Sequence, residues 1–186
     1  MNISSLLEER DVTYENFLSY ITTKFKSERA RTALIKNKAR QIIRECAPNN
    51  PAYYEKLRER LEKIIQAEEE RRKGEADYFN NYREIYEEAL SEDRKRKNLG
   101  FSTKFEFAVY NEIQLIVNNY KESKNTTKTI FEKIKKETEI VGWKSKTSSK
   151  KNMSNIIYDV LTENKFPEGK VDEITTKIID LAERNL

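Results

Sequence analysis

The sequence has 186 residues, of which 37% are hydrophobic and 37% charged, with a net charge of +4 and one cysteine. This composition favours helices that each bury a narrow apolar stripe, and it excludes an internal disulfide. It also excludes a transmembrane helix, because no stretch approaches the ~20 apolar residues that cross a bilayer. The first residues lack a basic start and a continuous apolar run, so we expect no signal peptide and a cytoplasmic protein.

The residues and motifs that most often mark an active site are missing from the chain, although carboxylates are plentiful. There is no histidine, the commonest general base and metal ligand, and Cys46 alone cannot build a structural zinc site. The four glycines are scattered and none is followed by Lys-Ser or Lys-Thr, so the phosphate-binding P-loop is absent. We therefore expect no catalytic residue, no metal site and no cofactor in this chain.

Apolar residues at helical spacing organise the first half of the chain. They predict helices over residues 3–10, 13–25, 28–46 and 78–90, and a further helix that begins at Pro51. In the segment 28–46 the expected buried side comprises Ala30, Ala33, Leu34, Ile42 and Ile43, and the expected polar face comprises Arg29, Arg31, Lys36, Lys38, Arg40 and Arg44. Residues 68–73 have no apolar stripe, so they either project into solvent or are covered by a partner. Residues 91–98 are predicted to be a polar connector.

The second half opens with a capping-box pattern, Thr103 followed three residues later by Glu106. The helix that it starts is the most apolar of the chain and is expected to lie at its centre. After it we expect a loop over 118–125 and then a helix that is capped by Thr126 or Thr127 and ends at Gly142. A polar linker over 145–149 follows, and its last serines are expected to cap a helix that begins near Lys150. The last helix is expected after Pro167 and Gly169.

These patterns predict an all-α fold, an irregular bundle of seven or eight amphipathic helices without a convincing strand. We expect a single domain over residues 1–186. Its possible sub-parts are 1–98, which carries the charged segment, and 99–186, a C-terminal helical core.

The positive charge is concentrated in residues 121–153, where ten lysines stand against four glutamates, a net charge of +6. The same stretch holds Trp143, the only tryptophan. Trp143 is either an anchor in the core or hinge, or a hot spot for a partner. Four lysines follow it closely in the sequence: Lys144, Lys146, Lys150 and Lys151. They have three possible roles, which are to form a solvated linker, to contact an acidic partner or to contact phosphate.

Three segments stand in a fixed order along the chain: Asn50–Ile65; Leu99-Gly100-Phe101 leading into Phe105–Asn111; and Gly142-Trp143-Lys144 followed by Met153, Ile156-Ile157, Leu161 and Lys165-Phe166-Pro167. Together they resemble the C-terminal helical region of the R (HsdR) motor and endonuclease subunit of type I restriction-modification enzymes. Residues 28–46 fit this family more loosely, and residues 1–27 show no counterpart. Gly142 departs from the family, which usually has an aspartate before the tryptophan.

The resemblance implies a docking and assembly role. In the full R subunit, other domains use ATP and magnesium for DNA translocation and cleavage, and none of their motifs occurs here. The helical region joins the motor to its partners, the methyltransferase and specificity subunits, so contact with DNA is expected to be indirect or weak and contact with a membrane absent.

Two alternatives stay open on the sequence alone. A helical DNA-binding module would depend on the lysines between Lys144 and Lys151 and would bind less tightly as salt rises. A free-standing helical adaptor would instead offer an apolar groove to a partner helix, and those lysines would matter little.

Overall fold

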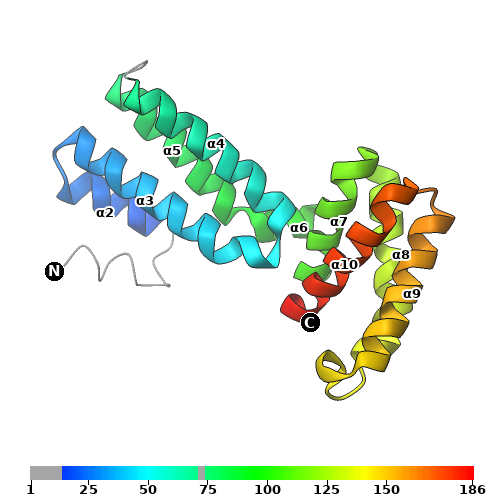
Figure 1. The fold of residues 1–186 in the computed structure, drawn as a ribbon. Coiled ribbons are helices and arrows are strands. Elements are labelled where there is room, and N and C mark those ends of the chain that lie inside the picture. The colour runs from blue at the N-terminus through cyan, green and yellow to red at the C-terminus, as the bar shows by residue number, and fades with distance from the viewer. Residues whose placement is uncertain (1–13, 71–73) are drawn as a thin grey trace. The chain divides into compact units, whose positions relative to one another are not determined.

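The fold is described by a computed structural model that covers residues 14–70 and 74–186. These residues form nine α-helices and two short 3₁₀-helices, and they contain no strand (Figure 1). The helices are α2 (Tyr14–Lys24), α3 (Glu28–Cys46), α4 (Pro51–Glu69), α5 (Glu75–Leu90), α6 (Glu92–Asn98), α7 (Lys104–Val117), α8 (Tyr120–Thr138), α9 (Thr147–Glu163) and α10 (Glu168–Asn185). The 3₁₀-helices are η1 (Ala47–Asn49) and η2 (Trp143–Ser145). The all-α class is confirmed, whereas the helix predicted over 3–10 lies outside the described residues.

The predicted count of seven or eight helices is too low for the described part, because the expected connector over 91–98 forms α6. Its first turn carries Glu92 and Asp93 and its last turn carries Lys95, Arg96 and Lys97. This order of charges suits the helix dipole, with acids at the N-terminus and bases at the C-terminus. A segment without any apolar stripe is therefore still helical.

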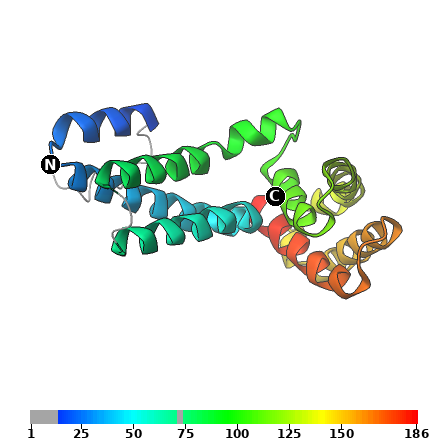
Figure 2. The ribbon, with the colours of Figure 1, turned by 90° about the horizontal axis from the view of Figure 1, so that it is seen from above.

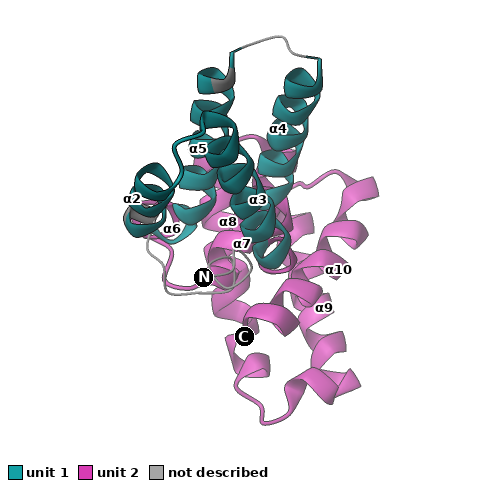
Figure 3. Cartoon of the chain, turned by 90° about the vertical axis from the view of Figure 1, so that its left-hand side faces the viewer, with its two compact units in different colours: residues 1–46, 54–94 teal, residues 47–53, 95–186 magenta. Residues whose placement is uncertain are grey.

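The chain divides into two compact units (Figure 3). Unit 1 comprises residues 1–46 and 54–94, and unit 2 comprises residues 47–53 and 95–186. The chain crosses between the units three times: once between α3 and η1, once inside α4 and once inside α6. The expectation of one domain with sub-parts 1–98 and 99–186 stays a prediction.

In unit 1, helices α3, α4 and α5 run alongside one another (Figure 2). Phe17 of α2 packs against Tyr86 of α5, with ring centroids 5.4 Å apart. The Tyr54 hydroxyl of α4 donates to the carbonyl of Ala89 at 3.2 Å and lies 2.9 Å from a carboxylate oxygen of Glu92. An aromatic contact thus holds α2 against α5, and a hydrogen bond holds α4 against α5.

The buried face of α3 differs from the predicted one. Its buried residues are Thr32, Ile35, Lys38, Ala39 and Ile43, while Ala33 is exposed and Leu34 and Ile42 are only partly buried. Lys38, expected on the polar face, is only 8% exposed and donates to Gln41 Oε1 at 3.3 Å. Burial lowers the pKa of Lys38, although Glu45 acts in the opposite direction. The prediction failed because it counted only apolar residues, whereas the packed face includes a threonine and a lysine stem.

In unit 2, helices α7, α8, α9 and α10 each contact the next helix in the chain, and α10 also contacts α7. This closed, up-and-down order is that of a four-helix bundle. Phe105, Ala108, Val109 and Ile113 of α7 are all buried in its core, and the expected place of α7 at the centre of the chain stays a prediction. The predicted stripe of the last helix is confirmed as well; it comprises Val171, Ile174, Ile178, Leu181 and Ala182.

Side chains cap the starts of α7 and α8, and the sequence revealed one of these two caps. The capping box of Thr103 and Glu106 is confirmed, with both reciprocal hydrogen bonds present. The predicted loop over 118–125 is wrong. Asn118 adopts the left-handed conformation (φ 48°), and the side chain of Asn119 then accepts N–H groups of the next turn, so α8 begins at Tyr120. The threonines expected to cap this helix, Thr126 and Thr127, are buried inside it.

Candidate partner-binding site at the α8–α9 connection

The connection between α8 and α9 is held by its own hydrogen bonds. Gly142 has φ +71°, a left-handed conformation that reverses the chain after α8. The N–H of Trp143 donates to the carbonyl of Ile140, and both the N–H and the hydroxyl of Ser145 donate to the carbonyl of Gly142, over 2.9–3.0 Å. The N–H of Lys146 donates to the carbonyl of Trp143 at 3.0 Å. The connection is therefore an ordered turn.

The start of α9 differs from the prediction. The helix begins at Thr147, with Lys146 at the N-cap and no side-chain capping bond. Ser149, expected to cap a later start near Lys150, lies within the first turns and is buried. Likewise Gly169, expected to separate α9 from α10, lies inside α10.

Trp143 lies in the apolar core of unit 2. Its side chain is 5% exposed and belongs to the cluster that includes Ile134, Met153 and Ile157. This burial favours the core-anchor interpretation over an exposed hot spot. Contact between Trp143 and a partner stays a prediction.

The four lysines of the predicted site fall into two groups. Lys144, Lys146 and Lys151 are exposed and make no ion pair with any residue that the structure describes. The ammonium of Lys144 lies 5.9 Å from the ring centroid of Trp143. Lys150 is half-buried and forms an ion pair with Glu183 of α10. The first group is thus available to a partner, and Lys150 already holds α9 to α10.

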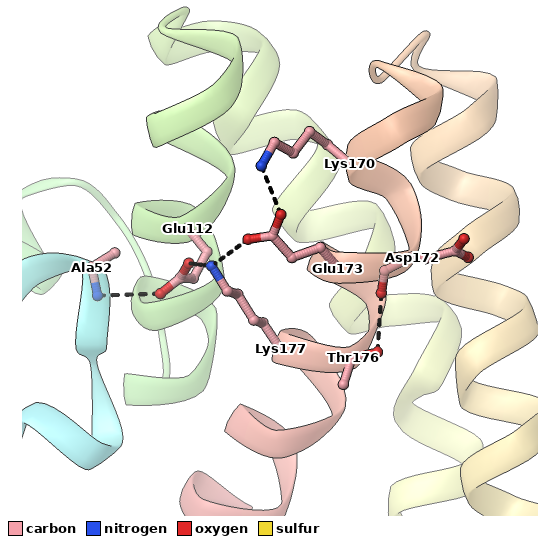
Figure 4. A network of polar contacts seen from close by, with 7 residues as sticks. All are labelled: Ala52, Glu112, Lys170, Asp172, Glu173, Thr176 and Lys177. Atoms are coloured by element: carbon pink, nitrogen blue, oxygen red, sulfur yellow. Dashed lines mark hydrogen bonds and ion pairs between the residues drawn. The ribbon is translucent and has the colours of Figure 1, made fainter.

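A polar network on another side of unit 2 centres on the buried Glu112 of α7 (Figure 4). Its carboxylate accepts the backbone N–H of Ala52 at 3.2 Å and lies 3.7 Å from the ammonium of Lys177. Lys177 also pairs with Glu173 at 3.0 Å, and Glu173 pairs with Lys170 at 2.7 Å. Hydrogen bonds from Lys170 and Lys177 lower the pKa of Glu173 to about 2, and the hydrogen bond to Glu173 in turn raises the pKa of Lys177. The network ties the start of α4 to α7 and α10.

A hollow of about 340 Å³ opens beside this network and is lined by Pro48, Pro51, Glu112, Lys177, Asp180, Leu181 and Arg184. Its two acidic side chains, Glu112 and Asp180, offset the charge of its two basic ones, Lys177 and Arg184. The hollow therefore favours neither a positively nor a negatively charged ligand. No group of three potential metal ligands occurs within residues 14–70 and 74–186.

A comparison with models of known protein families identifies the family to which the chain is related. The model of the family described as "Type I restriction enzyme HindI endonuclease subunit-like, C-terminal" matches residues 8–185. The chain belongs to this family. A comparison with curated proteins finds no match, and neither does a comparison with solved structures.

The match to the restriction endonuclease subunit family extends further than the resemblance seen in the sequence. It begins at residue 8, so the family includes most of residues 1–27, for which the sequence pattern had shown no counterpart. It also spans the whole α8–α9 connection. In the described part of this family member, no helix combines the length and the apolar character that a membrane span requires.

Sequence reasoning missed two exposed apolar residues of this restriction-subunit region. Val141 is 91% exposed and Ile140 is 37% exposed, directly before Gly142. It also missed Lys136, which is exposed in the last turn of α8. A usable signal was present: Ile140 and Val141 come after the last buried position of α8, Ile134, and before a glycine that ends the element.

Proposed function

We propose that this chain is the docking and assembly part of a type I restriction endonuclease subunit. In this role it contacts the methyltransferase-specificity core and supports the ATP-dependent DNA translocation and cleavage that other domains carry out. ATP and magnesium are then bound by those other domains. The observation that carries the proposal is the family match over residues 8–185, in a chain without histidine or a P-loop.

The exposed lysines beside Trp143 support a contact with an acidic partner surface. Lys144, Lys146 and Lys151 carry positive charge that no described acidic residue offsets. Charge complementarity of this kind raises association rates and excludes unsuitable partners. Lys150 contributes less to such a contact, because it is paired with Glu183.

The decisive experiment is a calorimetric titration of the full chain with the purified methyltransferase-specificity core from the same source, with duplex DNA alone as the control. Saturable binding to the core, without comparable binding to DNA, supports the docking role. Absence of binding to the core under conditions where both proteins are folded contradicts it.

A DNA-binding module is the second candidate, favoured by the net charge of +6 in residues 121–153. Neutralisation of phosphates by lysine releases counterions, so the logarithm of the affinity would fall linearly with the logarithm of the salt concentration. Tight binding to duplex DNA alone with this dependence, lost on changing Lys144 and Lys146 to glutamate, would favour that function over docking.

A further inference from the structure

We propose that Val141 is the apolar anchor of the docking contact, inserted into an apolar pocket with an acidic rim on the methyltransferase-specificity core. We call four exposed lysines of the same connection, Lys136, Lys144, Lys146 and Lys151, the basic collar. This inference rests on the proposed function and names the surface through which it acts. We call these five residues the α8–α9 tip.

Exposure to solvent distinguishes Val141 from the tryptophan. Val141 is 91% exposed, whereas Trp143, two residues later, is 5% exposed. Other large apolar side chains are exposed in the described residues, and Leu115 comes next at 52%. Burial of this branched aliphatic side chain against a partner would lower the free energy, because the transfer of apolar surface out of water is favourable. The apolar contact of this region therefore belongs to Val141 and not to the tryptophan.

The turn that carries Val141 is ordered by its own hydrogen bonds and by the core. The hydrogen bonds from Trp143, Ser145 and Lys146 to carbonyls within the turn fix its backbone, and the buried indole fixes it to the core. A surface that is ordered before binding loses less conformational entropy when a partner docks. The tip thus presents Val141 in one defined place.

The connection between α8 and α9 carries an excess of positive charge. Between residues 135 and 151 there are six lysines and two glutamates. Lys135 lies 3.8 Å from Glu139, Glu137 accepts from the side chain of Asn152 at 3.3 Å, and Lys150 pairs with Glu183. The collar lysines keep their charge uncompensated by any described residue. The partner surface that complements this collar is acidic.

The combination of an apolar anchor and a basic collar distinguishes a protein pocket from DNA. A phosphate backbone complements the lysines but offers no apolar pocket to Val141. On DNA, only the lysine charges would therefore contribute to affinity. On an acid-rimmed protein pocket, both the valine and the lysines contribute.

The test uses the full chain carrying Val141→Glu, titrated into the purified core. The matched control is Tyr158→Glu, which places the same charge at another exposed apolar position (44% exposed) on α9, roughly 16 Å along the helix from its start. We expect Val141→Glu to weaken binding at least tenfold and Tyr158→Glu to change it less than twofold. Both positions are exposed, so helical circular dichroism is expected to be unchanged.

A second measurement follows the tip directly. Because Trp143 is the only tryptophan of the chain, fluorotryptophan labelling gives one fluorine NMR signal, two residues from Val141. We expect this signal to shift or broaden when unlabelled core is added to the wild-type chain, and to remain unchanged with the Val141→Glu variant at the same concentration.

The outcomes separate the two proposals. If the wild-type chain binds the core and Val141→Glu binds equally well, the anchor is wrong and the docking function stands. If the wild-type chain does not bind the core, the docking function fails and the anchor fails with it. If Val141→Glu abolishes adsorption to vesicles of anionic phospholipid but leaves core binding intact, the tip serves a membrane surface and the inference is overturned.

Discussion

Glu112 of α7 accepts the backbone N–H of Ala52 at 3.2 Å, so a side chain from one helix caps the first turn of another 60 residues away in the sequence. The adjacent pair reinforces this contact, because the side-chain amide of Asn111 donates to Asn50 Oδ1 at 3.2 Å. The first turn of a helix leaves N–H groups without helical partners, and here a buried carboxylate satisfies one of them.

Removal of this cap is expected to destabilise unit 2. Glu112→Ala leaves the buried N–H of Ala52 without its acceptor and should lower the free energy of unfolding by about 1–3 kcal/mol. Glu112→Gln keeps a carbonyl acceptor and loses only the attraction to Lys177, so its effect should be smaller. Urea unfolding followed by Trp143 fluorescence measures both variants. Equal losses would contradict a capping role.

The Glu68 carboxylate gives unit 1 a stability that depends on pH. It accepts from Lys36 at 2.8 Å and from the Tyr82 hydroxyl at 2.6 Å. Burial alone would raise the pKa of Glu68, but these hydrogen bonds and the charges of Lys36 and Arg29 lower it from its ordinary value of 4.5. A lowered folded-state pKa stabilises the fold above about pH 4.5, and this contribution is lost as the pH falls through the folded-state value.

We therefore expect Glu68→Gln to lower the melting temperature at pH 7, and the difference from wild type to shrink below pH 4.5. Melting followed by circular dichroism across this range tests the expectation. Lys63→Gln, at an exposed position of the same helix, is the control. A difference that stays constant with pH would exclude Glu68 as its source.

Two helix ends in unit 2 share one backbone motif with different residues. After α6, Gly100 is left-handed (φ +73°) and the N–H of Phe101 donates to the carbonyl of Arg96 at 3.1 Å. After α9, Lys165 takes the corresponding place (φ 56°) and the N–H of Phe166 donates to the carbonyl of Leu161 at 3.1 Å. Glycine adopts this conformation without steric cost, and lysine does not.

Substitutions at these ends should therefore have opposite signs. Lys165→Gly is expected to stabilise the chain by up to ~1 kcal/mol, and Gly100→Ala to destabilise it by about 1 kcal/mol. A Cβ at Gly100 would meet nothing closer than 3.6 Å, so the cost comes from the backbone and not from a clash. Chemical unfolding compares the two variants, and destabilisation by Lys165→Gly would refute the reasoning.

Substitution of Trp143 and substitution of its neighbouring lysines should change the free energy of unfolding by very different amounts. Trp143→Ala leaves a cavity in the core and is expected to cost about 3–5 kcal/mol. Lys144→Glu and Lys146→Glu, at exposed positions, should change the unfolding free energy by less than about 0.5 kcal/mol. Circular dichroism melts of the variants make the comparison. A stable Trp143→Ala variant would show that the indole is not a core anchor.

Local signals in the sequence predicted much of the fold. The bounds of α3, the start of α4 at Pro51, the capping box at Thr103 and the stripe of α10 all follow from nearby residues. Each depends on a cap, a proline or an apolar period within about two turns of helix. Such features act before any tertiary contact forms, so the sequence shows them.

Features that depend on distant partners could not be predicted in the same way. The buried face of α3 includes Lys38, whose stem packs in unit 1 although its charge suggested solvent. Within the candidate site, Lys150 is paired with Glu183, a residue 33 positions later that no local pattern connects to it.

The discontinuity of unit 2 has a practical consequence for protein engineering. A fragment cut at residue 95 would lack residues 47–53, and Asn111 and Glu112 would lose the backbone and amide groups that they contact. The side chain of Asn185 donates to the carbonyl of Asn49 at 3.0 Å, so this missing segment lies against the C-terminal end of α10. A circular permutant that appends residues 47–53 after residue 186 through a short glycine-serine linker would therefore restore a contiguous four-helix unit.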